Sequence, residues 1–460
     1  GERVRSSLRS RNASSRQRPA RRLPTNFPAT TSMTAIVGPG CFGGELNAAL
    51  VGHQLFFPVA HAYTVGMGGF LLQGGFGWNS PQLGMGCQNV IGIDVVLADG
   101  SLVHASDTEH PDLFWSARGA GPGFFGVVVR FHLKLHARPR FIGLKVQVFR
   151  MKHLEQVMTW ADRAGPHVAA NVEFQLVGNP KALLINAPGM EIVAPVFADS
   201  WKQAREHVDF ISHSPVRSLA SFTLPLLPVS LEFMMKTGEK TLFLSNTRWS
   251  ADNMWMDGPI DPVLPRLRQI ADTQPPHPSH WLWLNWNGPK QRPDMAFSVE
   301  NRTYLALYCG LGKGVDESQH IDWATKHMKA LEPWSRGIQL ADENLARRPA
   351  RFVSDAHMAR LDQVRAKYDL SCLAFLDHTG SSCPPAVKEA MINWVGPILS
   401  DRYGATESGT ICSISSTEWL AHRGSVGKCA SRFTAHVVDD NDVEVPVGQT
   451  GRLFFIDHTG

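Results

Sequence analysis

The chain has 460 residues, of which 43% are hydrophobic and 19% are charged, and its formal net charge is +4. This balance is typical of a water-soluble globular protein with two or three domains, each large enough to bury a core. No run of 18 apolar residues is present, so we expect no membrane-spanning helix. The seven cysteines are too sparse for a disulfide scaffold and are not spaced as paired metal ligands. We therefore expect a cytoplasmic protein without a metal site.

The first 33 residues carry the excess positive charge, because eight arginines fall within the first 22 positions. This segment nearly lacks acidic and apolar residues, so it buries too little surface to offset the entropy of folding, and we expect residues 1–33 to be a disordered tail. A mitochondrial transit peptide has a similar composition, but the apolar helical face that it needs is missing here. The rest of the chain is close to neutral and has no basic stripe interleaved with aromatic residues, so we expect no nucleic-acid partner.

Residues 34–140 contain short apolar runs separated by glycines, a pattern that predicts β-strands. The pair Asp99-Gly100 lies between two of these runs and predicts a tight hairpin, since both residues tolerate a positive φ. The predicted strands are Ala35–Val37, Gly92–Leu97, Leu102–His104 and Val127–Leu135.

Glycines are densest between His61 and Asn89. At this density the backbone can approach a flat ring or a pyrophosphate and present amide donors, although a turn-rich β region has a similar composition. A second cluster, at Gly121, Gly123 and Gly126, matches the GxGxxG pattern. It leads into a predicted strand, whereas the dinucleotide fingerprint requires a helix after the glycines, so we do not expect a Rossmann fold.

From residue 141 to residue 340, apolar runs alternate with amphipathic stretches, which suits a sheet with helices on one face. Trp281, Trp283, Trp286 and Phe297 would suit a pocket for an aromatic or alicyclic substrate, although aromatic residues are also common in cores. The predicted strands are Gly143–Phe149, Val172–Val177, Glu191–Phe197 and Ala296–Cys309, and the predicted helices are Lys152–Ala164, Ser200–Ser212, Pro262–Thr273, Ile321–Leu331 and Pro349–Tyr368.

Taken in order, six motifs of residues 64–128 resemble the flavin domain of the berberine-bridge-like and vanillyl-alcohol-oxidase-type (PCMH-type) FAD-dependent oxidases. The resemblance extends over residues 34–375 and includes Glu343-Asn344-Leu345 and Tyr368-Asp369 near its end. The six matches are Thr64–Gly69 (TVGVGG), Gln73–Gly77 (GGGxG), Asn89-Val90, Val95–Gly100 (VVxADG), Asp112–Gly119 (DLFWxxRG) and Phe125–Val128 (NFGVV).

This resemblance implies an α+β fold and FAD as the cofactor. Residues 34–140 would be the second half of the FAD-binding domain, because the family's Arg-Gly-Gly-His-type loop has no match in residues 1–33. Residues 141–340 would form a substrate-binding domain with a helix-flanked antiparallel sheet, and residues 341–375 would return to the FAD domain. The implied flavin-binding residues are His61, Thr64, Gly66, Gly68, Gly69, Gly74, Gly75, Gly77, Asn89, Val90, Gly126 and Val128.

The resemblance also implies hydride transfer from a small organic alcohol or amine to flavin N5, with oxygen as the acceptor of the electrons. No residue is identified as the catalytic base. A cysteinyl flavin link is not expected, because Ala62 and Tyr63 precede the TVG turn. A histidine beside a glycine turn is also a common hydrogen-bonded structural residue, so both interpretations of His61 stay open.

Residues 376–460 resemble a different family, the adenylate-forming acyl-CoA synthetases, and predict a partial α/β unit. Gly380–Pro384 is similar to that family's adenine-side turn, and Tyr403–Glu407 to its YGxTE motif. The family's phosphate loop and catalytic lysine have no match, and adenylation needs the triphosphate held and neutralised. Two alternatives to the oxidoreductase follow: an adenylating ligase, or a non-catalytic truncated fusion.

Overall fold

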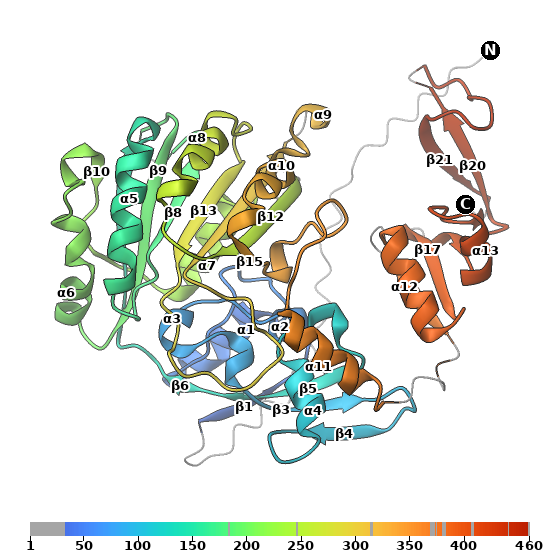
Figure 1. Ribbon diagram of the computed structural model, residues 1–460, viewed down its shortest axis with the longest axis horizontal. Coiled ribbons are helices and arrows are strands. Elements are labelled where there is room, and N and C mark those ends of the chain that lie inside the picture. The colour runs from blue at the N-terminus through green and yellow to red at the C-terminus, as the bar shows by residue number, and fades with distance from the viewer. Residues whose placement is uncertain are drawn as a thin grey trace.

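The computed structural model describes residues 33–182, 185–244, 247–312, 316–368, 373, 375–379, 383–405, 409–439 and 441–458. The predicted disordered tail therefore lies outside the described residues, apart from Met33. Two packed units form one body, and a smaller C-terminal unit lies to one side of it (Figure 1). We refer to them as the glycine-rich unit (residues 33–140), the large-sheet unit (residues 141–368) and the C-terminal unit (residues 375–458).

The glycine-rich unit contains an antiparallel sheet with the strand order β1-β5-β3-β4. Ile93, Val95, Phe131 and Leu133 pack against the helices, and the other face of the sheet carries polar side chains. Its strands are β1 (Thr34–Val37), β2 (Leu55–Phe56), β3 (Val90–Val96), β4 (Leu102–Ala105), β5 (Val127–Lys134) and β6 (His136–Ala137), and its helices are α1 (Gly43–Val51), α2 (Met67–Leu72), α3 (Ser80–Leu83) and α4 (Pro111–Ala117).

The large-sheet unit is built on a nine-stranded sheet with the order β10-β7-β9-β8-β13-β14-β12-β15, in which β11 pairs with β7. Helices α5, α6, α8 and α10 cover one face of this sheet and share the largest hydrophobic core with it (Figure 1). The strands are β7 (Phe141–Arg150), β8 (Gln175–Asn179), β9 (Gly189–Ala198), β10 (Ala220–Thr223), β11 (Leu227–Pro228), β12 (Arg248–Met256), β13 (His280–Asn285), β14 (Thr303–Leu311) and β15 (Ser335–Gly337).

The helices of this unit include one that joins it to the glycine-rich unit: α7 places Leu231, Met234 and Met235 in the core of that unit. The α-helices are α5 (Leu154–Ala164), α6 (Trp201–Ser212), α7 (Leu231–Thr241), α8 (Leu264–Asp272), α9 (Glu317–His320), α10 (Trp323–Ala330) and α11 (Asp355–Arg365). Short 3-10 helices of the whole body lie at Gly86–Asn89, Gly121–Gly123, Met151–His153, Gly165–His167, Arg217–Leu219, Asp261–Val263, Glu332–Trp334 and Leu340–Asp342.

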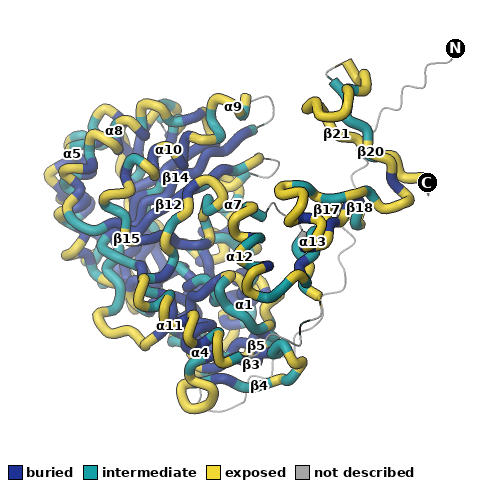
Figure 2. Tube along the Cα trace, turned by 45° about the vertical axis from the view of Figure 1, so that its right-hand side comes forward, coloured by how far each residue is buried: buried dark blue, intermediate teal, exposed yellow. Residues whose placement is uncertain are grey.

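The C-terminal unit begins with a parallel β-α-β arrangement in which β16 pairs with β17 across α12. Its hydrophobic cores are small, and Figure 2 colours many of its residues as exposed. Its elements are β16 (Leu376–Thr379), α12 (Pro385–Val395), β17 (Leu399–Ala405), β18 (Gly409–Ile414), α13 (Ser416–Ala421), β19 (Lys428–Cys429), β20 (Phe433–Val438) and β21 (Arg452–Asp457).

Several local predictions are confirmed and others are wrong. The hairpin at Asp99-Gly100 joins β3 to β4, and Gly100 has a φ of +83°. The predicted strand Ala296–Cys309 is wrong before Thr303, because the amides of Ala296 and Phe297 donate instead to carbonyls at the C-terminal end of α4, those of Trp115 and Arg118. The predicted helix Pro349–Tyr368 is shorter, since Ser354 caps the first turn of α11. β12 and β13 were not predicted as strands.

Among the described helices, none combines the length and the apolar character needed to cross a bilayer.

Candidate active site

The face of the large sheet opposite its helices meets the glycine-rich unit. Side chains alternate along each strand, so Trp255 of β12, Leu284 of β13 and Tyr304 of β14 turn toward this interface. Met85 and Cys87 of the glycine-rich unit pack against them. The interface is therefore a junction of two units, the kind of place where small-molecule sites commonly form.

Aromatic rings line this interface. Phe76 contacts the rings of Trp255, Trp286 and Tyr304, with centroids 5.6 to 5.7 Å apart. Farther along the same strands, His280 stacks on Tyr308 at a centroid distance of 4.6 Å.

Phe243, which follows α7, covers this second group of rings: its centroid lies 5.8 Å from Trp249, 5.6 Å from His280 and 5.5 Å from Tyr308. Burial lowers the pKa of His280 to about 4, so this imidazole is neutral at physiological pH. The surroundings are thus apolar and largely uncharged.

One carboxyl group lies among these rings. Asp342, at the end of a 3-10 helix, accepts hydrogen bonds from the hydroxyls of Tyr304 at 3.0 Å and Tyr308 at 2.9 Å. Desolvation raises the pKa of Asp342, although the two hydroxyls and the nearby His61 act in the opposite direction. Desolvation also raises the pKa of both tyrosines well above 10, so they remain hydroxyl donors.

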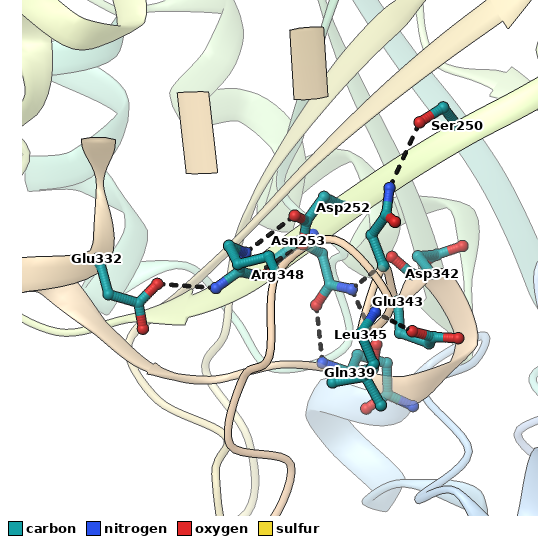
Figure 3. A network of polar contacts seen from close by, with 10 residues as sticks. Ser250, Asp252, Asn253, Glu332, Gln339, Asp342, Glu343, Leu345 and Arg348 are labelled. Carbon is teal, nitrogen blue, oxygen red and sulfur yellow. Dashed lines mark hydrogen bonds and ion pairs between the residues drawn. The ribbon is translucent and has the colours of Figure 1, made fainter. Parts of the chain in front are cut away.

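A hydrogen-bond network fixes the position of Asp342 (Figure 3). The Nδ2 atom of Asn253, on β12, donates to the carbonyls of Gln339 and Asp342, each at 2.8 Å. The Oδ1 atom of Asn253 accepts from the amide of Gln339 at 2.7 Å. One buried side chain therefore ties both ends of the 339–342 segment to the sheet.

Arg348 ties the continuation of this segment to the same strand. Its guanidinium forms a two-point ion pair with Asp252, with nitrogen–oxygen distances of 2.7 and 2.9 Å. It also donates to the carbonyl of Asn253 at 2.6 Å and to Glu332 at 2.8 Å. The side chains of Arg348 and Asp252 are only 4% and 1% exposed, so the pair is buried.

His61 faces the interface and is held by the large-sheet unit. Its Nε2 atom lies 3.1 Å from Oε2 of Glu173, whose side chain is 1% exposed. The other oxygen of Glu173 accepts from the amide of Asn79. The ring centroid of His61 also lies 4.5 Å from that of Trp78. The contact with Glu173 thus supports the interpretation of His61 as a hydrogen-bonded structural residue. A contact of His61 with the flavin stays a prediction.

The predicted flavin-binding turn at residues 64–69 presents an open surface at two of its glycines. A Cβ added at Gly69 would meet no atom within 4 Å, and one added at Gly66 would meet only the Pro39 carbonyl at 3.7 Å. Gly68 leaves no such space for a ligand, because an added Cβ would lie 2.8 Å from the Cβ of Pro39. Thr64 is exposed and bonds through its amide and hydroxyl to Glu239. A ligand can approach the turn at Gly66 and Gly69.

The next three predicted glycines pack against the protein itself. Gly74 and Gly75 have φ of +107° and +78°, a backbone conformation that favours glycine. A Cβ at Gly74 would lie 2.9 Å from the ring of Phe297, and one at Gly77 would lie 2.3 Å from the carbonyl of Val59. Packing alone thus requires glycine at Gly74 and Gly77.

The remaining predicted residues lie in or beside the core of the glycine-rich unit. Asn89 donates to the carbonyls of Leu83 and Met85, and its Oδ1 lies 2.7 Å from Nε2 of His136. Val90 and Val128 are buried, and a Cβ at Gly126 would lie 2.5 Å from Cγ2 of Val95. A role of these residues in binding a cofactor stays a prediction.

Two unpaired polar atoms at the interface bear on whether a flavin fits. Among the described residues, the buried Oε1 of Gln339 and Nε1 of Trp255 have no hydrogen-bond partner. Gln339 also donates through Nε2 to the carbonyl of Gln73, next to the glycine turn. One unpaired acceptor and one unpaired donor at this interface fit the polar edge of a flat heteroaromatic ring.

Sequence reasoning missed the residues at the centre of this site: Asp342, Tyr304, Tyr308 and Asn253. The tyrosines are four residues apart in the predicted strand Ala296–Cys309, a spacing that places them on the same face and could have identified them as neighbours. Asp342 and Asn253 have no local signal. The four aromatic residues that the sequence offered for a substrate pocket lie in two different places. Trp281 and Trp283 lie in the core under the helices, whereas Trp286 and Phe297 lie at the interface.

Residues 28–106 match a family model described as an FAD binding domain, and residues 344–458 match one described as an AMP-binding enzyme. The chain is 30% identical over 337 residues to the FAD-linked oxidoreductase nodO of Hypoxylon pulicicidum, covering 72% of this chain and 74% of that protein. It is 27% identical over 381 residues to a carbohydrate oxidase of Microdochium nivale, covering 73% and 72%.

Among solved structures, the fold is similar to that of 6-hydroxy-D-nicotine oxidase from Arthrobacter nicotinovorans. The TM-score is 0.62 at 21% identity, and the match covers 74% of this chain and 77% of that one.

Proposed function

The chain belongs to the berberine-bridge-like family of FAD-linked oxidoreductases, and from this premise we propose that Asp342 is the base in the oxidation of a small organic alcohol or amine. The predicted family, the PCMH-type fold class and the cofactor FAD are thereby confirmed. The observation that carries the proposal is the single carboxyl group placed between two tyrosine hydroxyls on the interface side of the sheet.

FAD, when bound, supplies the two-electron acceptor that takes a hydride from the substrate carbon. For a secondary alcohol, loss of that hydride from carbon and of a proton from the hydroxyl gives a ketone. The carboxylate of Asp342 accepts the proton. A raised pKa makes it a stronger base than an exposed aspartate, and the tyrosine hydroxyls, which stay protonated, orient it.

The residues that would hold the flavin are those that the structure leaves open or unpaired. Gly66 and Gly69 leave room for its approach, and Gln339 and Trp255 offer an unpaired acceptor and donor. The other predicted positions, such as Gly74 and Asn89, would act by keeping the turn in shape. No covalent attachment is proposed.

The rings near Asp342 support a substrate with an apolar or planar body. Phe243, Trp249 and the neutral His280 provide aromatic surface without a formal charge. An anionic substrate would lose its hydration there without gaining a partner. Oxygen as the final acceptor is part of the proposal and is supported by the similarity to the Microdochium nivale carbohydrate oxidase.

The test is the visible spectrum of the purified protein, before and after addition of FAD and then of candidate substrates without oxygen. We expect flavin bands at about 370 and 450 nm, with bleaching of the longer band by a neutral alcohol or amine. Readmitted oxygen should restore the band and produce hydrogen peroxide. A protein that stays colourless after incubation with FAD would contradict the proposal.

A second candidate function, adenylation of a carboxylic acid, has one observation in its favour. The match to the AMP-binding model covers residues 344–458, and β16, α12 and β17 form the expected β-α-β unit. The motif residues Gly380–Ser382 and Thr406-Glu407 lie outside the described residues. Binding of ATP by a protein without flavin absorbance would favour this function, and binding of neither ligand would favour a non-catalytic fusion.

A further inference from the structure

A cluster of two histidines and one aspartate lies on the polar face of the small sheet, on the side away from the helices. Oδ1 of Asp94 is 2.8 Å from Nδ1 of His104 and 3.0 Å from Nε2 of His132. The three atoms all lie within 4.8 Å of one another. The proposed active site uses none of these residues.

Strand register brings the three side chains together. Asp94 on β3 is directly opposite His104 on β4, and His132 on β5 is opposite Gly92 on β3. Gly92 leaves the space that the cluster needs, because a Cβ there would lie only 3.0 Å from Cε1 of His104. Three neighbouring strands therefore each supply one ligand atom to the same point.

The cluster is accessible from solvent and carries an ionised carboxylate. The side chains of His104, His132 and Asp94 are 40%, 24% and 15% exposed. Desolvation alone would raise the pKa of Asp94, but hydrogen bonds from His104, His132 and Arg130 outweigh it and lower the pKa. Asp94 is therefore an anion at neutral pH, and a bound ion would take the place of the protons that the two imidazole nitrogens share with its Oδ1 atom.

We propose that Asp94, His104 and His132 bind one divalent transition-metal ion of the zinc class, with water completing the coordination. Two imidazoles and a carboxylate are donors that Zn²⁺ accepts in a tetrahedral arrangement. Bonds of about 2.0 to 2.2 Å at tetrahedral angles place ligand atoms about 3.4 Å apart. The two Asp94–histidine separations, 2.8 and 3.0 Å, need to open by only about half an ångström to reach that geometry, and the two histidine nitrogens already lie within 4.8 Å of each other.

Arg130 competes with the metal for the carboxylate. Its guanidinium lies 3.2 Å from Oδ2 of Asp94, the oxygen that the histidines do not contact, and its side chain is 58% exposed. The positive charge of Arg130 therefore weakens cation binding without occupying a ligand position. Replacing Arg130 therefore distinguishes a metal site from a purely structural ion cluster. Its removal should strengthen the binding of a metal ion, but it should weaken a cluster held together by ion pairs.

The test is calorimetric titration of the chelator-treated full chain with ZnCl₂, with Co²⁺ absorption as an independent measure of coordination. We expect one tight equivalent of Zn²⁺, lost in His104→Ala and His132→Ala, since even outer-shell partners change metal affinity by about 10- to 100-fold. His213→Ala is the matched control, because His213 is exposed and contacts a single aspartate. That variant should titrate like the natural sequence.

A variant that keeps all three ligands tests the proposal even if the histidine variants fail to fold. Arg130→Gln should bind Zn²⁺ at least severalfold more tightly, and the rise in its melting temperature with added Zn²⁺ should be larger. Absence of a tight equivalent in the natural sequence would overturn the proposal. So would an equivalent that survives both histidine substitutions, or one that Arg130→Gln weakens.

Discussion

At Asp342, opposing influences act on the pKa of one carboxyl group. Desolvation raises the pKa, whereas the hydroxyls of Tyr304 and Tyr308 and the charge of His61 lower it. The net shift is upward, so the ionised group is a better proton acceptor than an exposed aspartate. The same balance predicts how substitutions at Asp342 and at His61 should behave.

Asp342→Asn removes the proton acceptor and preserves the shape of the side chain. We expect kcat/KM for flavin reduction to fall by about 10²- to 10⁴-fold, the usual contribution of a general base, with an unchanged flavin spectrum. Anaerobic stopped-flow reduction measures this. Glu343→Gln is the control, since Glu343 is exposed and bonds only to the neighbouring amide of Leu345. Equal rates in the two variants would exclude Asp342 as the base.

The pH profile should identify the same group. Protonation of Asp342 removes its basicity, so kcat/KM should fall as the pH drops through a pKa above the ordinary aspartate value of 3.8. His61→Gln removes a charge that lowers this pKa, and the inflection should therefore move to higher pH. A profile that keeps its acid limb in Asp342→Asn would assign the limb to another group.

At the scale of elements, the segment from Gln339 to Arg348 takes its shape from β12 and not from its own sequence. Asn253 bonds to Gln339 and Asp342, and Arg348 bonds to Asp252 on the same strand (Figure 3). Asp252 and Asn253 are residue types depleted in strands, and here they anchor a neighbouring loop. This explains why strand propensity alone did not predict β12.

Arg348→Met should destabilise the protein strongly. It leaves Asp252, 1% exposed, as a buried charge without its ion-pair partner, which costs about 3 to 5 kcal/mol. Urea unfolding of the large body measures the loss. The adjacent Arg347, 43% exposed and paired with an exposed aspartate, is the matched control, and Arg347→Met should change stability far less. Asp252→Asn combined with Arg348→Met should recover part of the loss.

At the scale of the whole molecule, the two larger units share a core and buried hydrogen bonds, whereas the C-terminal unit meets the main body where the Arg365 guanidinium lies 5.6 Å from the ring centroid of Trp394. Helix α7 enters the core of the glycine-rich unit, and Glu173 bonds across the interface to His61 and Asn79. The C-terminal unit has small cores, and its ribbon of β20 and β21 exposes Phe454 and Ile456 by 48% and 50%. Figures 1 and 2 show it beside the main body.

We therefore predict two transitions in scanning calorimetry. The C-terminal unit should melt first, because a small core leaves little net stability. Added FAD should raise only the second transition, since a ligand stabilises the folded unit that binds it. A single transition that shifts as a whole with FAD would show that the units unfold together and would contradict this prediction.

The sequence by itself determined the family, the order of the glycine motifs and the hairpin at Asp99-Gly100. These depend on local signals, such as a positive φ or a run of apolar residues, which neighbours along the chain can specify. The placement of domain boundaries at 140/141, 340/341 and 375/376 stays a prediction.

Only the tertiary structure decided which side chains meet. Asp342 lies 38 residues from Tyr304 and 34 from Tyr308, and strand pairing and the Asn253 anchor bring them within hydrogen-bond distance. Asp94, His104 and His132 converge in the same way from three strands. Register and packing decide such meetings, and neither has a local signal, because a one-residue slip of a strand moves every side chain to its other face.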